Sequence, residues 1–208
     1  GGEDTILKIN CSEYAGPHEY AKLIGSPPGY VGSNEPGILA TKAEESSKWV
    51  ILFDEIEKAD TKLHNLLLGF LDDGQITDNK GNVLDFTNSI FLFTSNVGIH
   101  DNVGIKTLGF ENKVSTYEST KEKVMDAFKQ EFSPEFINRI DEIIFFNQLT
   151  REDAESITKL NLLDLPIKIT KKLVSHVVDN AYSPEYGARN IKRYIKQNVT
   201  LKLADKIL

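Results

Sequence analysis

Several kinds of residue are rare in this 208-residue sequence, and each scarcity excludes a class of protein. A single cysteine, Cys11, excludes an intramolecular disulfide and favours a reducing compartment, either the cytoplasm or the matrix or stroma of an organelle. No apolar run approaches the roughly 18 residues that span a bilayer, and the first residues resemble neither a signal peptide nor a transit peptide. We therefore expect an intracellular protein with no membrane segment.

Basic residues are also in the minority. Lys and Arg total 24 against 31 Asp and Glu, and the net charge of -7 argues against a nucleic-acid-binding surface. Arginine itself occurs only at Arg139, Arg151, Arg189 and Arg193. This scarcity makes each arginine a candidate for a specific role.

The apolar residues in the first part of the chain are arranged as in an α/β fold. Residues 49–53 (WVILF) and 89–94 (SIFLFT) are apolar runs typical of strands buried in a parallel sheet, and residues 5–10 alternate as a shorter strand does. The segments between them have the spacing of helices, and residues 143–146 have the composition of a last strand. Strands separated by helices predict a parallel α/β sheet.

Two other features interrupt this pattern. Short extended pieces at 75–77 and 83–86 flank the turn-forming residues 78–81 (DNKG), which predicts a hairpin. Residues 97–116 are polar and contain several glycines, so we expect a long loop, which in a compact domain is usually functional or disordered.

Beyond the sheet the chain is expected to be entirely helical. Helices are predicted near 151–163, 169–180 and 187–207, and Thr150 with Asp153 has the spacing of a capping box. This change of pattern predicts two domains.

The first domain is an α/β core over residues 1–148, and the second is a small helical domain over residues 149–208. The hinge between them is expected at residues 147–150. The sequence contains no internal repeat and no low-complexity segment.

Two adjacent acids end the predicted strand at 49–53. Asp54 and Glu55 would lie at the carboxyl edge of a parallel sheet, where α/β folds bind ligands. In P-loop ATPases the first acid of such a pair holds the magnesium ion through water, and the second orients and polarises the attacking water. The alternative is an ordinary strand end with two solvated acids.

An amide follows the next predicted strand. Asn96 would lie beside the two acids, where it could position water and touch a γ-phosphate. On its own, such a residue is more often part of a turn. The two strand ends together, about forty residues apart, make the pattern more specific than either alone.

Six segments stand out: GSPPGYVG (25–32), LFDEIEKA (52–59), LDDG (71–74), TSNVG (94–98), PEFINRIDE (134–142) and YGAR (186–189). In order and spacing they resemble the second AAA+ module of the Clp ATPases, most of all the peptidase-coupled branch typified by ClpC and ClpA. The resemblance implies a P-loop AAA+ sheet followed by a helical lid. It also implies a homo-oligomeric ring, a hexamer, that uses ATP and magnesium to thread unfolded protein substrates through its pore.

The resemblance assigns roles to the residues of the nucleotide site. Asp54 and Glu55 match the Walker B pair, with Asp54 holding magnesium through water, and Asn96 matches sensor one. Arg139 matches the arginine finger, which reaches into the neighbouring subunit's site. Arg189 matches sensor two, through which the lid contacts the nucleotide.

Each arginine also has a plainer interpretation. Arg139 could be a surface residue paired with Asp141 or Glu142, and Arg189 a surface charge near a helix start. Finding two of only four arginines at the motif positions favours the functional interpretation.

The glycine-rich segment 25–32 matches the first pore loop of the family. Tyr30, followed by Val31, matches the aromatic residue that grips a passing polypeptide by packing against it. The predicted hairpin around 78–81 corresponds to the second pore loop. The alternative for Tyr30 is a tyrosine that covers a turn.

A further match lies within the long loop. Leu108, Gly109 and Phe110 resemble the apolar tip by which peptidase-coupled Clp ATPases dock onto a ClpP-type peptidase. Burial of two such side chains in partner pockets would contribute roughly 1.5–3 kcal/mol each. The alternatives are that they fold back onto their own domain, or that the chain belongs to a ClpB-like disaggregase, which has no such tip.

One motif of the family is missing from the sequence. No G-x-x-x-x-G-K-[ST] phosphate loop occurs, so we expect the chain on its own to neither bind ATP tightly nor hydrolyse it. In the family that loop precedes the position of Gly1, and we expect it in the intact parent. The alternative is a degenerate, non-hydrolysing scaffold or regulatory subunit, for which intact Asp54, Glu55, Asn96, Arg139 and Arg189 would have no use.

Overall fold

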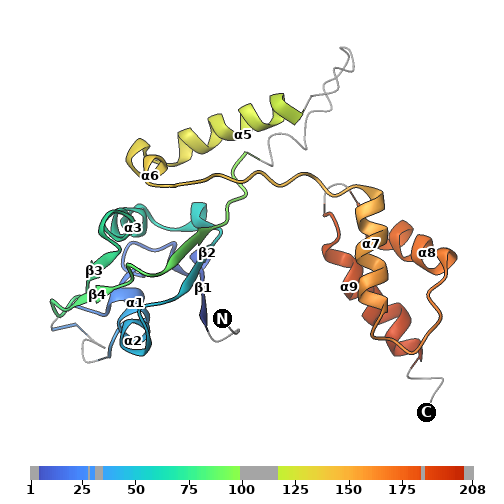
Figure 1. Cartoon of the computed structure of the whole chain (residues 1–208), viewed down its shortest axis with the longest axis horizontal. Helices are drawn as coiled ribbons and strands as arrows, with labels where there is room; N and C mark the ends of the chain where they lie inside the picture. Colours follow the sequence, from blue (N-terminus) through green and yellow to red (C-terminus); the bar gives the residue numbers. More distant parts are fainter. Residues whose placement is uncertain (1–4, 28, 31–34, 99–116, 184–185, 204–208) are drawn as a thin grey trace. The chain divides into compact units, whose positions relative to one another are not determined.

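The computed structural model describes residues 5–27, 29–30, 35–98, 117–183 and 186–203. The chain divides into two compact units, Gly1–Ile143 and Ile144–Leu208 (Figure 1). The boundary expected from the sequence, between residues 148 and 149, lies in the extended segment that follows this division.

The first unit is built on a parallel sheet. Its strands are β1 (Ile6–Asn10), β2 (Val50–Asp54) and β5 (Ile90–Phe93), in the order β1-β2-β5. The register pairs Asn10 with Asp54 and Phe53 with Phe93, so the strands end together at one edge. The predicted parallel α/β sheet is confirmed.

Helices pack against one face of this sheet. They are α1 (Ala21–Ile24), α2 (Ile38–Glu45), α3 (Thr61–Asp73) and α6 (Pro134–Asn138). The side chain of Asp60 caps α3 by accepting from the backbone N–H of Lys62, and Ser133 caps α6, in which Pro134 takes the first position.

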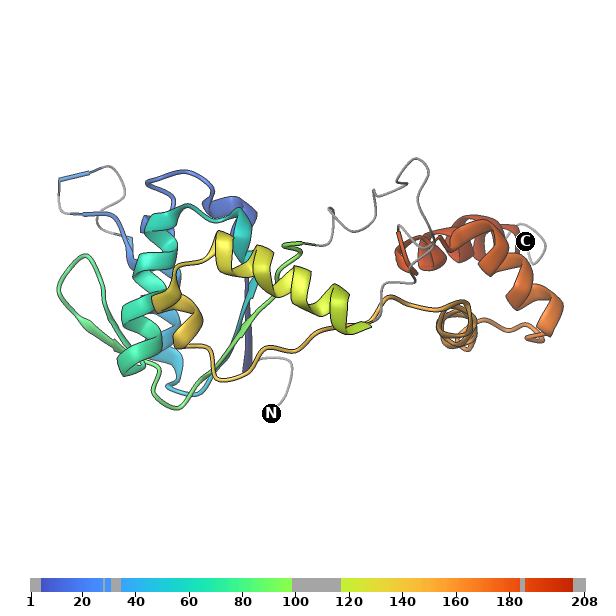
Figure 2. The ribbon, with the colours of Figure 1, turned by 90° about the horizontal axis from the view of Figure 1, so that it is seen from above.

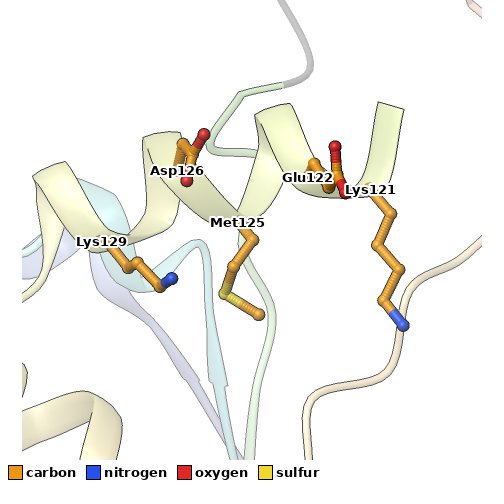
Figure 3. Close-up of a pocket in the computed structure, with 5 residues that line it drawn as sticks. All are labelled: Lys121, Glu122, Met125, Asp126 and Lys129. Atoms are coloured by element: carbon orange, nitrogen blue, oxygen red, sulfur yellow. The ribbon is translucent and has the colours of Figure 1, made fainter. Parts of the chain in front are cut away.

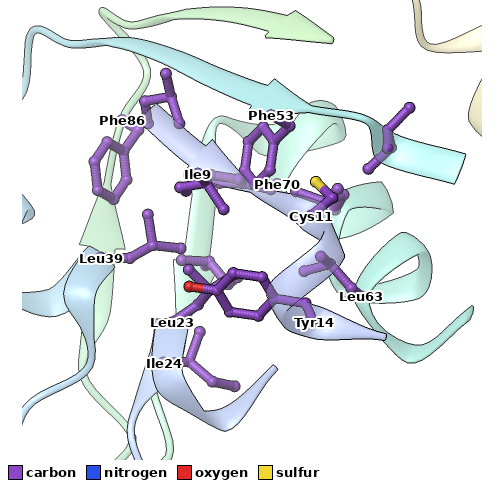
Figure 4. Close-up of a cluster of buried hydrophobic side chains, with 14 of the residues drawn as sticks. Ile9, Cys11, Tyr14, Leu23, Ile24, Leu39, Phe53, Leu63, Phe70 and Phe86 are labelled. Carbon is purple, nitrogen blue, oxygen red and sulfur yellow. The ribbon is translucent and has the colours of Figure 1, made fainter. Parts of the chain in front are cut away.

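The hydrophobic core lies between this sheet face and the helices (Figure 4). Ile51 and Phe53 alternate into it from β2, and Leu63, Leu67 and Phe70 enter it from α3. The helix α5 (Tyr117–Glu131) leads into α6, which lies beside α3 in Figures 1 and 2. Ring contacts hold these elements together: His64 lies against Phe132 and Phe136, with centroids 5.4 and 5.9 Å apart.

The chain between α3 and β5 forms a separate hairpin. Its strands are β3 (Gln75–Thr77) and β4 (Val83–Asp85), which pair antiparallel as the sequence predicts. The carboxylate of Asp78 accepts hydrogen bonds from the backbone N–H groups of Lys80 and Asn82 and from the Asn82 amide. These bonds lower the pKa of Asp78 and organise the turn, although burial opposes them.

The other face of the sheet differs from the expectation. The sequence predicts β2 and β5 as strands covered on both sides, yet Ile90 is 60% and Leu92 48% exposed. They stay exposed because side chains alternate along a strand, and the helices described above pack against the opposite face. The prediction of burial on both faces is therefore wrong for β5, whereas the residues of β2 are buried or half-buried.

The predicted last strand is also wrong. Residues 143–146 form no strand, and Phe146 is 94% exposed. A strand is stable only when hydrogen-bonded to a neighbour, and none of the strands in the described ranges pairs with this segment. The segment therefore stays outside both sheets of the described ranges.

The second unit is helical, as predicted. It contains α7 (Arg151–Leu162), α8 (Lys171–Ala181) and α9 (Arg189–Ile195), and α9 continues into the single π-helical turn η4 (Lys196–Thr200). The helix expected from residue 187 begins two residues later, because Gly187 first pairs with Ser183 in an isolated β-bridge.

Capping and packing stabilise this unit. Thr150 and Asp153 form the predicted capping box, and Arg151 pairs with Asp179 of α8 at 2.5 Å. The core consists of small and branched apolar side chains: Ala154, Leu162, Val174, Val177, Val178, Ala181, Ile191 and Ile195. Across the described ranges of both units, no helix is long and apolar enough to cross a membrane.

Two glycines of the first unit should respond oppositely to the same substitution. A Cβ atom at Gly37 would lie 2.3 Å from the carbonyl oxygen of Leu23 and 2.4 Å from the nitrogen of Gly25. At Gly69, exposed within α3, a Cβ atom would meet nothing within 4 Å. We expect Gly37→Ala to lower the free energy of unfolding by about 1–3 kcal/mol, and Gly69→Ala to raise it by about 0.5–1 kcal/mol.

Urea unfolding of the two variants beside the parent measures both changes. Equal effects at the two positions would show that the packing around Gly37 is looser than described.

Candidate functional site at the carboxyl edge of the sheet

The ends of β2 and β5 are joined by Thr94. Its hydroxyl donates to Oδ1 of Asp54 at 2.5 Å and accepts from the backbone N–H of Glu55 at 3.0 Å. Its carbonyl accepts from the N–H of Ile56, also at 3.0 Å. One threonine therefore holds both acids in place relative to the neighbouring strand.

Glu55 has an unusual backbone. Its φ of 58° and ψ of 54° are left-handed, and it is the one non-glycine residue with positive φ among the described residues. Such a conformation costs of order 1–3 kcal/mol, and such residues cluster at functional sites. The Glu55 carboxylate accepts from the hydroxyl of Ser12 at 3.1 Å and from the amide of Asn96 at 3.4 Å.

Asn96 is held by its backbone as well as its side chain. Its N–H donates to Oε1 of Glu57 at 3.2 Å. The other oxygen of Glu57, Oε2, is buried and has no hydrogen-bond partner in the described structure. The structure thus brings together three residues singled out from the sequence, Asp54, Glu55 and Asn96, and it adds Glu57.

Three further groups surround the acids. Lys8 of β1 pairs with Oδ2 of Asp54 at 2.6 Å. Cys11 is buried behind the acids; burial first, and then the charges of Glu57, Asp54 and Glu55, raise its pKa to about 12. Since the thiol stays protonated far above neutral pH, Cys11 is a packing residue and not a nucleophile.

The donor set of the edge suits a magnesium ion bound with its substrate. Carboxylate and hydroxyl oxygens are the hard ligands that magnesium prefers, and it is usually held by one or two carboxylates together with water and phosphates. No group of three or more His, Cys, Asp or Glu within the described ranges could hold a metal by itself. Asp54, whose side chain is 31% exposed, is the residue that would hold magnesium, and no all-protein cage surrounds it.

Arg139, the predicted arginine finger, does not pair with either of the acids that its alternative interpretation as a surface residue named. Arg139 donates through Nε and Nη2 to the two carboxylate oxygens of Asp72, and not to Asp141 or Glu142. Its Nη1 donates to the carbonyl of Glu135 at 3.0 Å. Asp72 and Arg139 both belong to the first unit.

The remaining predicted residues belong to other segments of the chain or lie outside the described ranges. Tyr30 is 70% exposed, and its N–H donates to the carbonyl of Pro27 at 3.2 Å. Arg189 belongs to the second unit, where it is exposed at the first position of α9. Val31 and the segment Leu108, Gly109 and Phe110 lie outside the described residues.

Two family models match the chain. The model described as AAA domain (Cdc48 subfamily) matches residues 1–143, and the model described as the C-terminal, D2-small domain of ClpB protein matches residues 149–208. The chain belongs to the AAA family. The second model, together with the relatives below, confirms the resemblance to Clp ATPases that the six motifs indicate.

Relatives over the whole chain are Clp proteins. The chain is 39% identical to chaperone protein ClpB of Oceanobacillus iheyensis, with 99% of this chain and 27% of that protein covered. It is 39% identical to chloroplastic ClpC2 of Oryza sativa subsp. japonica and 40% identical to a ClpA homolog, an ATP-binding subunit of Clp protease, of Porphyra purpurea. These matches cover all of this chain and 24% and 27% of those proteins, so it spans about a quarter of their length.

Solved structures give the same result. A cryo-electron microscopy reconstruction of Hsp104 with ATPγS and FITC casein matches with a TM-score of 0.84 and 33% identity. A complex of S. cerevisiae Hsp104 with casein in an extended conformation matches equally well. In both, 99% of this chain and 36% of the solved chain are covered.

Some site residues could not be found by motif. Lys8 and Ser12 lie outside the six matched segments and reach the acids through contacts between parts of the chain far apart in sequence. Glu57 and Thr94 lie within the matched segments 52–59 and 94–98, which are the signal that could have singled them out. A hollow along α5, lined by Lys121, Glu122, Met125, Asp126 and Lys129, contains none of the predicted site residues (Figure 3).

Removal of the Thr94 hydroxyl should disturb both acids at once. In the intact parent we expect Thr94→Val to reduce the ATP turnover that the family resemblance implies by roughly tenfold or more, because small displacements of catalytic groups are costly. Thr94→Ser keeps the hydroxyl and is expected to remain near the parental rate. Steady-state ATPase measurements compare the two, and equal rates for both would show that the hydroxyl does not position the acids.

Proposed function

We propose that this chain is the hydrolysing part of an AAA+ module in a Clp-type protein unfoldase. The observation that carries the proposal is the cluster at the carboxyl edge, in which Thr94 and Asn96 hold Asp54 and Glu55 together. A strained backbone at Glu55 supports it, because strain of this kind concentrates at functional sites.

Each residue then has a task. Asp54 would hold magnesium through water, and the ion bound with ATP would neutralise charge on the phosphates. Glu55 accepts a proton from the attacking water, and Asn96 orients that water and the Glu55 carboxylate. Arg139 of a neighbouring subunit and Arg189 of the helical unit contact the phosphates.

The phosphate loop would come from the parent protein. β5 pairs with β2 on one side only within the described ranges, and the exposed Ile90 and Leu92 lie on the uncovered face. Parallel sheets are normally covered on both faces, so a further strand beside β5 and a helix over this face suit the site. We expect a G-x-x-x-x-G-K-[ST] sequence between that strand and that helix.

A degenerate, non-hydrolysing scaffold is the rival. The interlocked contacts of Asp54, Glu55 and Asn96 argue against it, because a scaffold does not require an acid held in a strained backbone. A parent sequence with no phosphate loop upstream of Gly1 would decide for the scaffold.

The ring, its substrates and its partner are proposed from the relatives. We propose a homo-oligomeric ring, a hexamer, that acts on unfolded proteins in a reducing compartment, with Tyr30 and Val31 in its pore. The relatives include a ClpB chaperone and a Clp protease subunit at similar identity. Their identities therefore favour neither the peptidase-coupled nor the disaggregase interpretation. Docking of a ClpP-type peptidase through Leu108, Gly109 and Phe110 remains a prediction.

Glu55→Gln should separate ATP binding from hydrolysis. In the intact parent the amide keeps the shape of the side chain and one of its two accepting oxygens, but it cannot accept a proton. We expect ATP binding and ring assembly to persist while turnover falls by roughly a hundredfold or more, within the range of general-base catalysis. Calorimetry with ATP and a phosphate-release assay measure the two, and loss of both together would make Glu55 a structural residue.

Tyr30→Ala should impair unfolding of substrate protein and leave ATP hydrolysis intact. Tyr30 is exposed, and the hydrogen bonds that hold Asp54 and Glu55 do not involve it, so ATP turnover should stay within about twofold of the parent while unfolding of a tagged substrate fails. Tyr30→Phe keeps the ring and should retain unfolding. An alanine variant that unfolds substrate at the parental rate would assign Tyr30 to a turn.

A further inference from the structure

The guanidinium of Arg139 is held on two sides by its own subunit. Nε and Nη2 donate to the two oxygens of Asp72, the latter over 2.6 Å, and Nη1 donates to the carbonyl of Glu135 over 3.0 Å. Asp72 lies in the last turn of α3, and Arg139 is the C-cap of α6, 67 residues further along the chain. The pairing is therefore a tertiary contact and not a local one.

This arrangement fixes the plane of the guanidinium. Two parallel N–H···O bonds to one carboxylate set both the position and the orientation of an arginine, whose side chain is otherwise highly flexible. Each terminal nitrogen keeps a further N–H that no acceptor in the described ranges takes, and the side chain is 30% exposed. The arginine is thus oriented while donors remain for a ligand.

The pair is poorly explained as a fold-stabilising contact. The Asp72 side chain is 45% exposed, and ion pairs this exposed contribute little to stability. The elements it joins are already held by packing, in which His64 of α3 lies against Phe136 of α6. The hydrogen bonds from Arg139 lower the pKa of Asp72, so the carboxylate stays charged near neutral pH and the pair stays intact.

The neighbouring acid provides a contrast. Asp73 has the same side chain and directly follows Asp72, yet it forms no ion pair with the described residues. A helix turns by about 100° per residue, so the two carboxylates leave α3 in different directions. Only Asp72 faces Arg139.

We propose that Asp72 is a positioning residue that aims Arg139 at the nucleotide of the neighbouring subunit. The inference rests on the proposed function, because Arg139 must act in trans. It adds that the integrity of one subunit's α3–α6 contact determines the rate of hydrolysis in the next subunit. The opposite arrangement, in which Asp72 restrains Arg139 until ring assembly releases it, predicts the opposite sign in the experiment below.

The first measurement compares single variants in the intact parent. Asp72→Ala should lower the maximal ATP turnover by roughly tenfold or more while KM for ATP changes by less than about twofold, as expected when only transition-state contacts are lost. Asp72→Asn has the same shape and keeps one oxygen acceptor, so its maximal ATP turnover should lie between those of Asp72→Ala and the parent. Asp73→Ala should turn over ATP at the parental rate. A faster Asp72→Ala enzyme would overturn the proposal in favour of restraint.

The second measurement locates the defect. Rings mixed from Asp72→Ala and Glu55→Gln subunits should regain ATP turnover, because the intact Asp72–Arg139 pair of a Glu55→Gln subunit serves the intact acids of its neighbour. A merely structural defect would remain in the Asp72→Ala subunit, and mixing would rescue nothing.

Arg139→Ala separates failure of this inference from failure of the proposed function. If Arg139→Ala stays active, the role of Arg139 itself is wrong and the inference falls with it. If Arg139→Ala is inactive but both Asp72 variants turn over ATP like the parent, only the positioning role of Asp72 is refuted.

Discussion

The parallel pairing of β2 with β1 on one side and β5 on the other is the constraint on which the candidate site depends. Because the strands run in the same direction and in register, Asn10, Asp54 and the residues after Phe93 reach one edge together. The hydroxyl of Thr94 then converts this proximity into fixed positions for two acids. Residues forty positions apart in the sequence thus act as one group.

Much of this arrangement could be predicted from the sequence. The apolar runs that form β2 and β5 are followed directly by polar residues, so strand ends and site residues were identified from the same few letters. Capping residues such as Ser133 and Thr150 likewise specify helix starts locally. Features of this kind are predictable because the determining residues are adjacent in the chain.

The rest depends on contacts that sequence patterns do not contain. The backbone N–H of Glu55 donates to Thr94, and its carboxylate accepts from Ser12 and Asn96, none of which is near it in the chain. Residues 143–146 have the composition of a strand, but a strand requires a neighbour. The alternative to the arginine-finger interpretation paired Arg139 with the nearby acids Asp141 or Glu142, whereas its partner in the structure is Asp72, 67 residues away.

The burial of Cys11 has a practical consequence. It is the one thiol in this 208-residue segment, it is fully enclosed, and its pKa of about 12 keeps it protonated at neutral pH. Alkylating reagents react with an exposed thiolate, so labelling of Cys11 requires the region below the acid edge to open. The rate of maleimide incorporation at this position therefore records local unfolding of the sheet, without any engineered probe.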